Sequence, residues 1–432
     1  MTIVSAMAAK DTLGPVWRRL QIPPFGPTAL AVIAGIGIAA AVQDFRTDDP
    51  GTASQAIVPE AAGGGNAPRE RTSFLAKLIP PPPEKVEGPS APSSIEDLAS
   101  RLPLERKVQQ LFLLGLEGQD LTAPIYGQMR RQDLGGLVFE SRNYLDPQQI
   151  ASMAGEGTVI AADERHIPPF VMVSQEGGDF SEFRDLPPAQ APSEFGGVRE
   201  GEAAASEAAT SLRALGFNAV LAPDIDVGTS EEATGALDER AFSDDPAEVA
   251  EYGTAVVDAY RDQHVMPVPK HFPGLGAAAQ APEDGPTPVG LTVPELRARD
   301  LVPFRAVFDD HVAAVLIGHG SYTTDDFVTP ASLSKAIATD LLREQLGFGG
   351  VSISDDLASP AVTAISTIPD AAVDALKAGV DLVWISGPRG DQEAAMNAVL
   401  NAVQSGEISR ERIDQAVLRA LTAKQVAGLI AG

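Results

Sequence analysis

Short apolar runs alternate with amphipathic or alanine-rich stretches along most of this chain, and this alternation constrains its fold more than any other feature. The apolar runs have the length and composition of strands, and they occupy residues 112–116, 136–139, 170–173, 219–222, 266–268, 314–317, 351–353 and 381–385. Stretches of helical character separate most of them, for example residues 200–215, 246–263 and 332–346. Strands that alternate with helices predict an α/β fold with a parallel sheet.

Eight such repeats predict that the sheet closes into a (β/α)8 TIM-type barrel, because they extend over the ~250 or more residues that such a barrel needs. The alternative is an open, doubly wound sheet. That fold usually carries a glycine-rich phosphate loop after its first strand, and residues 115–118 hold only two glycines at that place. We therefore expect one catalytic barrel domain, over residues 94–432.

The first residues of the chain predict a membrane-targeting segment. Lys10, Arg18 and Arg19 precede an uncharged run at residues 28–42, which is shorter than the ~20 residues of a comfortable membrane span. This order is typical of a signal peptide, or of a short signal anchor whose basic end stays in the cytoplasm. We expect residues 1–27 to be the cytoplasmic region and residues 28–42 the apolar segment, with a buried core helix as the alternative.

Residues 43–93 predict a linker between this segment and the barrel. They include three consecutive glycines at residues 63–65 and four consecutive prolines at residues 80–83. Proline-rich chains are extended and hold a domain away from its anchor. We therefore expect the barrel to be extracytoplasmic, either anchored to a membrane or secreted.

Composition excludes several classes of function. The net charge of −27 leaves no basic stripe for phosphates, which argues against a nucleic-acid partner, and such an acidic surface favours a soluble monomer. The chain has no cysteine, so disulfides and a thiolate nucleophile are excluded. The carboxylates lack histidine-rich partners at metal-ligand spacing. We expect neither a metal nor an organic cofactor.

Polar residues follow the predicted strands at the ends where a barrel carries its chemistry. Two adjacent carboxylates, Asp355 and Asp356, come directly after Ser354 at the end of the 351–353 run. An Asp at such a place can also be a helix N-cap. Comparable residues follow other strands: Ser174, Gln175, Glu176, Asp224, Asp226, Lys270, His271 and His319. This pattern favours an enzyme or a polar-ligand site over a purely structural barrel.

Several of these segments resemble glycoside hydrolase family 3, and most closely its single-domain bacterial β-N-acetylglucosaminidases (β-N-acetylhexosaminidases). The resemblance rests on Lys-His-Phe-Pro-Gly at residues 270–274 together with Ser-Asp-Asp-Leu at residues 354–357. Ser-Gln-Glu-Gly-Gly at residues 174–178 and Asp-Glu-Arg-Ala-Phe at residues 238–242 agree with it. The resemblance implies a cell-wall glycan or amino-sugar oligosaccharide as the partner, and a location in the bacterial cell envelope.

The resemblance also implies roles for individual residues. Asp355 matches the nucleophile of a retaining mechanism, in which a carboxylate forms a glycosyl-enzyme that water later cleaves. Asp356 would be an orienting acid hydrogen-bonded beneath the site. The family's substrate-binding and pocket-lining positions are matched by Arg240, Lys270, His271, Ser174 and His319. From the residues alone, Arg240 could instead form an exposed ion pair, and His271 could be a supporting histidine.

Three places depart from the family pattern. The family's acid/base is a histidine in an Asp-Ser-His sequence, which comes soon after the Lys-His-Phe-Pro-Gly motif. Here that motif ends at residue 274, and residues 275–285 contain no histidine. Glu283, or its neighbour Asp284, could act as a carboxylic acid instead, as in most glycosidases, if burial raises its pKa. The alternative is an exposed acidic loop. Ser174 stands where the family has Asp, and Asp179 stands where it has Arg.

Two functions follow from these observations. The first is a retaining glycoside hydrolase that releases terminal β-N-acetylglucosamine-type sugars from cell-wall glycans. The second is a catalytically impaired, glycan-binding pseudoenzyme of the same fold. An aldolase with Lys270 as a Schiff-base residue is disfavoured, because no second lysine lies close by in the sequence to activate it.

Overall fold

The computed structural model describes residues 93–229, 237, 240–322 and 328–431. The predicted cytoplasmic region (1–27), the apolar segment (28–42) and all but the end of the linker (43–93) lie outside the described residues. None of the described helices combines the length and the apolar character that a membrane crossing requires.

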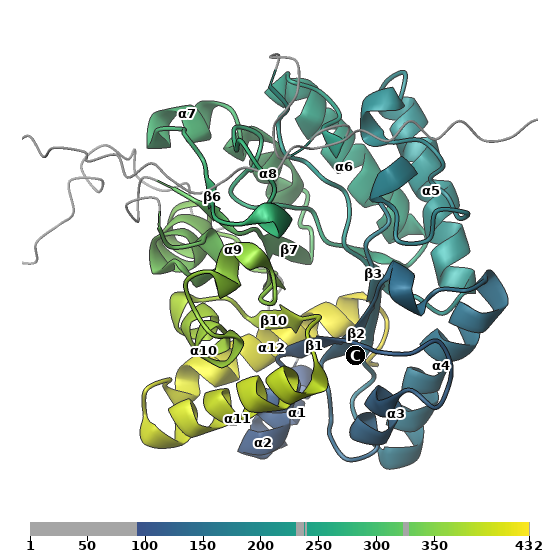
Figure 1. Cartoon of the computed structure of the whole chain (residues 1–432), viewed down its shortest axis with the longest axis vertical. Helices are drawn as coiled ribbons and strands as arrows, with labels where there is room; N and C mark the ends of the chain where they lie inside the picture. The colour runs from purple at the N-terminus through teal and green to yellow at the C-terminus, as the bar shows by residue number, and fades with distance from the viewer. Residues whose placement is uncertain (1–92, 230–236, 238–239, 323–327, 432) are drawn as a thin grey trace, which may run out of the picture. The chain divides into compact units, whose positions relative to one another are not determined.

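Eight parallel strands of the described chain form the centre of the fold (Figure 1). They are β1 (Phe112–Gly115), β2 (Gly136–Phe139), β3 (Phe170–Val173), β4 (Ala219–Val220), β5 (Met266–Pro267), β7 (Ala314–Ile317), β9 (Val351–Asp356) and β10 (Leu382–Ile385). They pair in the order β5-β4-β3-β2-β1-β10-β9-β7. Between the segment after β5 and β7, the Phe272 N–H donates to the Leu316 carbonyl at 2.9 Å and the Leu316 N–H donates to the Pro269 carbonyl at 3.0 Å. The predicted TIM-type barrel is therefore confirmed, and the open sheet is wrong.

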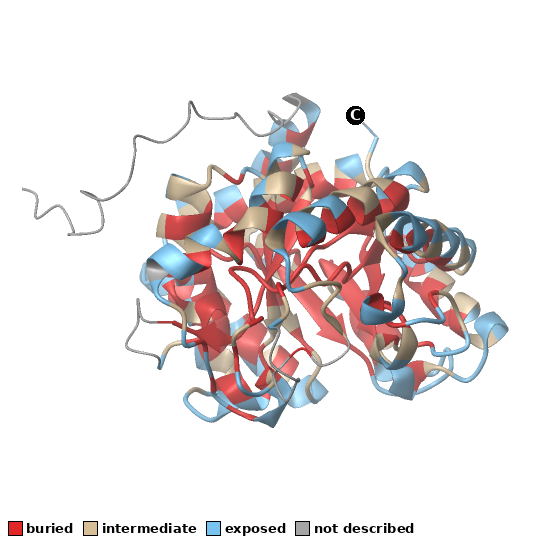
Figure 2. Cartoon of the chain, turned by 90° about the horizontal axis from the view of Figure 1, so that it is seen from above, coloured by how far each residue is buried: buried red, intermediate tan, exposed pale blue. Residues whose placement is uncertain are grey.

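Strands β1, β2, β3 and β7 carry no polar side chain, because both of their faces are covered. Every residue of β1, β2, β3 and β7 is buried, and Figure 2 shows these strands enclosed by helices that are exposed on their outer side. A parallel sheet covered on both faces needs continuous apolar strands instead of alternating ones. Aromatic pairs add to the core: Phe139 and Phe183 each meet Phe217 edge to face, with ring centroids 5.4 and 5.6 Å apart.

Helices surround the strands (Figure 1). They are α1 (Ser93–Arg101), α2 (Leu104–Gln109), α3 (Pro124–Met129), α4 (Pro147–Glu164), α5 (Val198–Ala214), α6 (Pro246–Asp262), α7 (Val293–Ala298), α8 (Leu301–Asp309), α9 (Pro360–Thr363), α10 (Ile368–Ala378), α11 (Arg389–Ser405) and α12 (Arg410–Val426). The stretches predicted at 200–215 and 246–263 are α5 and α6. The stretch predicted at 332–346 contains a π-helix, η9 (Ala336–Gln345).

A buried carboxylate ties the beginning of β10 to the outer helices. Asp381 pairs with Arg343 at 2.6 Å and with Arg412 and Arg419 at 3.0 Å each. Burial by itself would raise the pKa of Asp381, but the three guanidinium groups, Arg343 foremost, hold it below its usual value. Removing one partner of a buried ion pair typically costs about 3–5 kcal/mol. Arg343 also donates to Ser352 Oγ at 2.9 Å, so the same group fixes the beginning of β9.

The chain that follows β5 folds back on itself over residues 274–290. Ala278 and Val289 form an antiparallel bridge at its base, and β6 (Thr287–Pro288) pairs with β8 (Gly320–Ser321). A short 3-10 helix, η6 (Pro282–Asp284), lies between these anchors. Its Pro282 carbonyl accepts a hydrogen bond from Ser359 Oγ at 2.8 Å. The acidic loop expected from the sequence is therefore held at its base and at its tip.

Candidate active site

Asp355 lies at the carboxyl end of β9, where a barrel carries its chemistry. The residue is half-buried, and its Oδ1 accepts the Asp356 N–H at 2.9 Å. Burial by itself would raise the pKa of Asp355, but His319, His271 and the Asp356 N–H together lower it below its usual value. A carboxyl group with a lowered pKa is ionised at neutral pH, and an ionised carboxylate can act as a nucleophile.

Asp356 and His319 hold the end of β9 in place. Asp356 Oδ1 accepts the Ser386 N–H at 2.9 Å and the Ala358 N–H at 3.0 Å, and its other oxygen accepts from the Ser386 hydroxyl. His319 is buried. Its Nε2 lies 2.8 Å from the Asp356 carbonyl and its Nδ1 lies 2.8 Å from Ser332 Oγ. Because the carbonyl can only accept, Nε2 carries the proton, so His319 supports the chain beside Asp355.

Glu176 joins two cations from different segments, Arg240 between β4 and α6 and Lys270 after β5. Glu176 follows β3, and its buried carboxylate accepts hydrogen bonds from Arg240 Nη2 at 2.9 Å and from Arg240 Nε at 3.1 Å. It also pairs with Lys270 Nζ at 2.6 Å, and Lys270 donates to Ser174 Oγ at 2.9 Å. Burial opposes ionisation of Glu176, but Arg240 and Lys270 outweigh it and hold its pKa below the usual range. The group presents two fixed cationic donors, which suit sugar hydroxyls.

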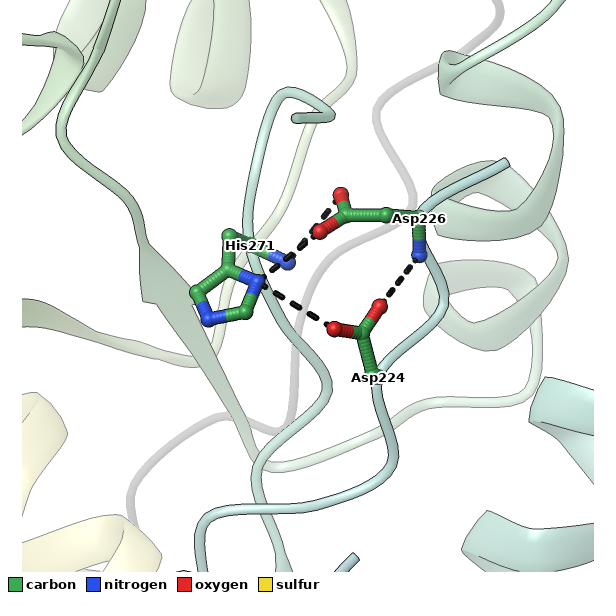
Figure 3. Close-up of side chains that lie close together, drawn as sticks. All are labelled: Asp224, Asp226 and His271. Carbon is green, nitrogen blue, oxygen red and sulfur yellow. Dashed lines mark hydrogen bonds and ion pairs between the residues drawn. The ribbon is translucent and has the colours of Figure 1, made fainter. Parts of the chain in front are cut away.

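A second buried group orients His271, and Figure 3 shows its three side chains facing one another. His271 Nδ1 lies 2.8 Å from Asp226 Oδ2 and 3.6 Å from Asp224 Oδ2. Asp224 Oδ1 accepts the Asp226 N–H at 2.9 Å. The two carboxyl groups follow β4 and His271 follows β5, so the pairing of these two strands brings the three residues together.

The protons in this group are set by burial. Burial, followed by the charge of Asp226, raises the pKa of Asp224 to about 8. Burial also raises the pKa of Asp226, to about 6, although the Leu275 and His271 N–H groups oppose this. Burial lowers the pKa of His271, against the attraction of Asp224. A neutral His271 therefore donates from Nδ1 to Asp226 and leaves Nε2 as an acceptor, 3.4 Å from Arg240 Nη2.

Asp224, Asp226 and His271 are also the described residues whose ligand atoms lie close enough, within 4.8 Å of one another, to hold a metal ion. Their chemistry does not favour one. His271 Nδ1 is already engaged with Asp226, and Arg240 Nε lies 3.5 Å from Asp224 Oδ2. A guanidinium at this distance repels a second cation. We assign the three residues to the orientation of His271.

The predicted acid lies on the loop over this face of the barrel. Glu283 and Asp284 are both exposed, on η6. The Pro282 carbonyl beside them is bonded to Ser359, which is in the segment that continues from Asp355. Burial by itself would lower the pKa of Arg240. Glu176 and Asp224, and more weakly Glu283, outweigh burial and raise the pKa of Arg240. Glu283 is therefore close enough to the site for its charge to act on Arg240.

The structure brings the predicted residues Asp355, Lys270, His271, Arg240, Ser174 and His319 to one end of the barrel. Arg240 is not in an exposed ion pair, because only 15% of its side chain is accessible. Asp179 lies apart: it forms an exposed ion pair with Arg184. Lys270 is engaged in an ion pair with Glu176, which fits substrate binding better than Schiff-base chemistry.

Three residues of the site received no role from the sequence: Glu176, Asp224 and Asp226. The available signal was their place directly after the buried strands β3 and β4. Carboxylates at that place serve either the substrate or a neighbouring side chain, and only their partners distinguish the two. Here the partners are Arg240, Lys270 and His271.

Known proteins resemble this chain in sequence and in structure. Residues 103–423 match the Glycosyl hydrolase family 3 N terminal domain. A beta-hexosaminidase of Stenotrophomonas maltophilia is 32% identical over 309 residues, which are 69% of this chain and 88% of that protein. The beta-hexosaminidase LpqI of Mycobacterium tuberculosis is 29% identical over 389 residues, 86% of this chain and 95% of that protein.

Solved structures agree with these matches. A glycoside hydrolase family 3 beta-N-acetylglucosaminidase from Paenibacillus sp. str. FPU-7 superposes with a TM-score of 0.71 at 32% identity, over 77% of this chain and 64% of that longer chain. The structure of LpqI from M. tuberculosis superposes with a TM-score of 0.68 at 27% identity, over 78% of this chain and 97% of that one. The family resemblance predicted from the sequence is confirmed.

Proposed function

This chain belongs to glycoside hydrolase family 3, and from that premise we propose that it is a retaining β-N-acetylhexosaminidase. The proposed reaction releases terminal β-N-acetylglucosamine-type sugars from cell-wall glycans. The proposal rests chiefly on Asp355, a carboxylate with a lowered pKa at the end of β9, surrounded by groups that can bind a sugar. The beta-hexosaminidases that resemble this chain support the choice of sugar.

In the proposed first step, an oxygen of Asp355 attacks the anomeric carbon while the bond from that carbon to the leaving sugar breaks. Glu283 gives its proton to the departing oxygen. In the second step, Glu283 takes a proton from water, the water oxygen attacks the anomeric carbon, and Asp355 is released. Two inversions retain the configuration. The acid/base part contributes about 10²–10⁴-fold to the rate.

The remaining residues of the site would bind and orient the sugar. Arg240 and Lys270 keep donors in fixed positions because Glu176 holds both. His271 would offer Nε2 as an acceptor, since Asp226 holds the proton on Nδ1. Ser174 is uncharged where family members carry Asp, so this part of the pocket has one negative charge fewer to accept from sugar hydroxyls.

The setting of this reaction is part of the proposal. Basic residues followed by the apolar run at 28–42 and the Pro/Gly-rich linker support an extracytoplasmic barrel, anchored or secreted, at the cell envelope. The net charge of −27 supports a monomer.

Covalent trapping tests the nucleophile. A 2-fluoro analogue of the sugar with an activated leaving group should accumulate as a glycosyl-enzyme, and peptide mass spectrometry should find the label on Asp355. Asp355→Ala should abolish both labelling and hydrolysis of aryl β-N-acetylglucosaminides. A label on Asp356 or Glu176 would overturn the assignment.

The second candidate is a glycan-binding pseudoenzyme. It is favoured by one observation: the two carboxylates near the place of the family's acid/base, Glu283 and Asp284, are both exposed. General acids of glycosidases are usually placed where burial adjusts them to that role, and neither of these residues is buried. Sugar binding measured by calorimetry, without hydrolysis of any glycoside including activated ones, would decide for this candidate.

A further inference from the structure

Ser359 connects the loop that carries Glu283 to the segment that carries Asp355. Its Oγ donates to the Pro282 carbonyl at 2.8 Å, across 77 residues of sequence. Its backbone N–H donates to the Asp356 carbonyl at 2.9 Å. Ser359 is only 9% exposed, so water competes little for these bonds. One small residue thus contacts both the neighbour of Glu283 and the neighbour of Asp355.

The base and the tip of the loop are held differently. The Ala278–Val289 bridge and the pairing of β6 with β8 hold its base. At the tip, a bond from Asp284 N–H to the Ala281 carbonyl is internal to the loop. Among the described residues, Ser359 is the one side chain from outside the loop that bonds to η6. At the tip, the bond from Ser359 adds to the packing of α9 against η6 and links the turn that carries Glu283 to the segment after β9.

We propose that Ser359 is a positioning residue of the reaction: by its bond to Pro282, its hydroxyl fixes the position of the Glu283 carboxyl group relative to Asp355. This inference rests on the proposed function, because it assigns Glu283 the role of acid/base. The hydroxyl has a second task, since it also caps α9 by accepting the Ala361 N–H at 3.4 Å. An experiment must separate the two tasks.

Two variants at Ser359 are compared with the loss of a cap on another helix. Ser359→Ala removes both the bond to Pro282 and the cap. Ser359→Thr keeps a hydroxyl for both. Thr367→Ala removes a comparable N-cap, that of α10. The Thr367 hydroxyl accepts the Asp370 N–H at 3.3 Å and does not touch the loop. If Ser359→Ala does not fold, Ser359→Gly replaces it, because Gly at an N-cap costs only a few tenths of a kcal/mol.

The measured quantity is a leaving-group ratio. It is kcat/KM for a disaccharide with terminal β-N-acetylglucosamine, divided by kcat/KM for the dinitrophenyl glycoside of the same sugar. Only the leaving sugar of the disaccharide needs a proton in order to depart. Misplacement of the acid therefore lowers the ratio, whereas a general loss of structure slows both substrates and leaves the ratio unchanged. We expect Ser359→Ala to lower the ratio about 10- to 100-fold, the scale of a small misplacement of a catalytic group. Ser359→Thr should restore it, and Thr367→Ala should leave it unchanged.

The failures are distinguishable with Glu283→Ala measured beside these variants. If Glu283→Ala lowers the ratio and Ser359→Ala does not, the positioning role is wrong while the proposed acid stands. If Glu283→Ala leaves the ratio unchanged, the acid assignment is wrong and the role of Ser359 falls with it. A fall of the ratio in Thr367→Ala equal to that in Ser359→Ala would also overturn the inference, because it would show an effect of capping alone.

Discussion

His271 Nδ1 lies 2.8 Å from a carboxylate oxygen of Asp226, although 45 residues separate the two in the sequence. Burial keeps the imidazole neutral, and a carboxylate can only accept, so the Nδ1 proton is fixed by this contact. The opposite ring nitrogen is left to accept from a ligand or from Arg240, 3.4 Å away. Asp226 thus determines that Nε2, and not Nδ1, is the ring nitrogen of His271 that can accept a hydrogen bond in the site.

Asp226→Asn should therefore weaken substrate binding. The amide can present its N–H₂ to Nδ1 and move the imidazole proton to Nε2, which turns an acceptor into a donor. A buried hydrogen bond to a charged group contributes about 1.5–3 kcal/mol, so kcat/KM should fall roughly 10- to 100-fold. Steady-state kinetics in the wild-type and His271→Ala backgrounds check this. An equal loss in both backgrounds would contradict the assignment, because interacting residues are not additive.

Glu283→Ala should slow substrates with a poor leaving group much more than substrates with an activated leaving group. Loss of general acid–base help should lower turnover of a natural disaccharide by about 10²–10⁴-fold while largely sparing the cleavage step of an activated aryl glycoside. Azide should raise turnover of the aryl glycoside in this variant, since azide attacks the glycosyl-enzyme without a general base. Asp284→Ala, the matched control on the same turn, should behave as wild type.

An unchanged disaccharide rate in both loop variants would place the acid elsewhere. A slow wild-type rate on the aryl glycoside, a far slower one on the disaccharide, and no effect of azide on Glu283→Ala would instead indicate an impaired enzyme.

Asp224→Asn should change the pH dependence of stability. In the folded protein the pKa of Asp224 is about 8, whereas in the unfolded chain it is ~3.9. The folded state therefore binds more protons between these values, so the stabilisation from the protonated group is complete below pH ~4 and is lost as pH rises toward 8. Asparagine does not titrate. The free energy of unfolding of Asp224→Asn, relative to wild type, should increase steadily over this window.

Urea unfolding at fixed ionic strength measures this difference, and Asp374→Asn, at an exposed position of α10, is the matched control. A difference that stays constant over the window would mean that Asp224 is ionised in the folded protein throughout.

Helix α1 should be needed for stability although it lies outside residues 103–423, the region that matches the family. It packs against α12, and its Ile95 is 1% exposed within the core. Loss of a buried Leu, Ile or Met side chain typically costs about 2–5 kcal/mol. A protein that begins at residue 93 should therefore keep its urea midpoint, and one that begins at residue 103 should unfold at clearly lower urea. Equal midpoints would show that α1 contributes nothing.

Sequence reasoning located the strands well. The predicted runs 136–139, 170–173 and 314–317 coincide with β2, β3 and β7. A strand covered on both faces must be apolar along its whole length, and this leaves a continuous signal in a short window. The helical stretch at 332–346 was less well predicted, because its apolar spacing does not distinguish the π-helix η9 from an α-helix.

The sequence by itself determined the barrel and the family, and it predicted Asp355 as the nucleophile, because each of these rests on local patterns and short motifs. Only the tertiary structure decided which partner each polar side chain has. Glu176 holds Arg240 across 64 residues, Asp226 holds His271 across 45, and Ser359 holds Pro282 across 77. Such contacts exist because strand pairing brings distant loop ends to one edge of the barrel. Burial and distance decide which polar groups meet, and no local window of the sequence contains either.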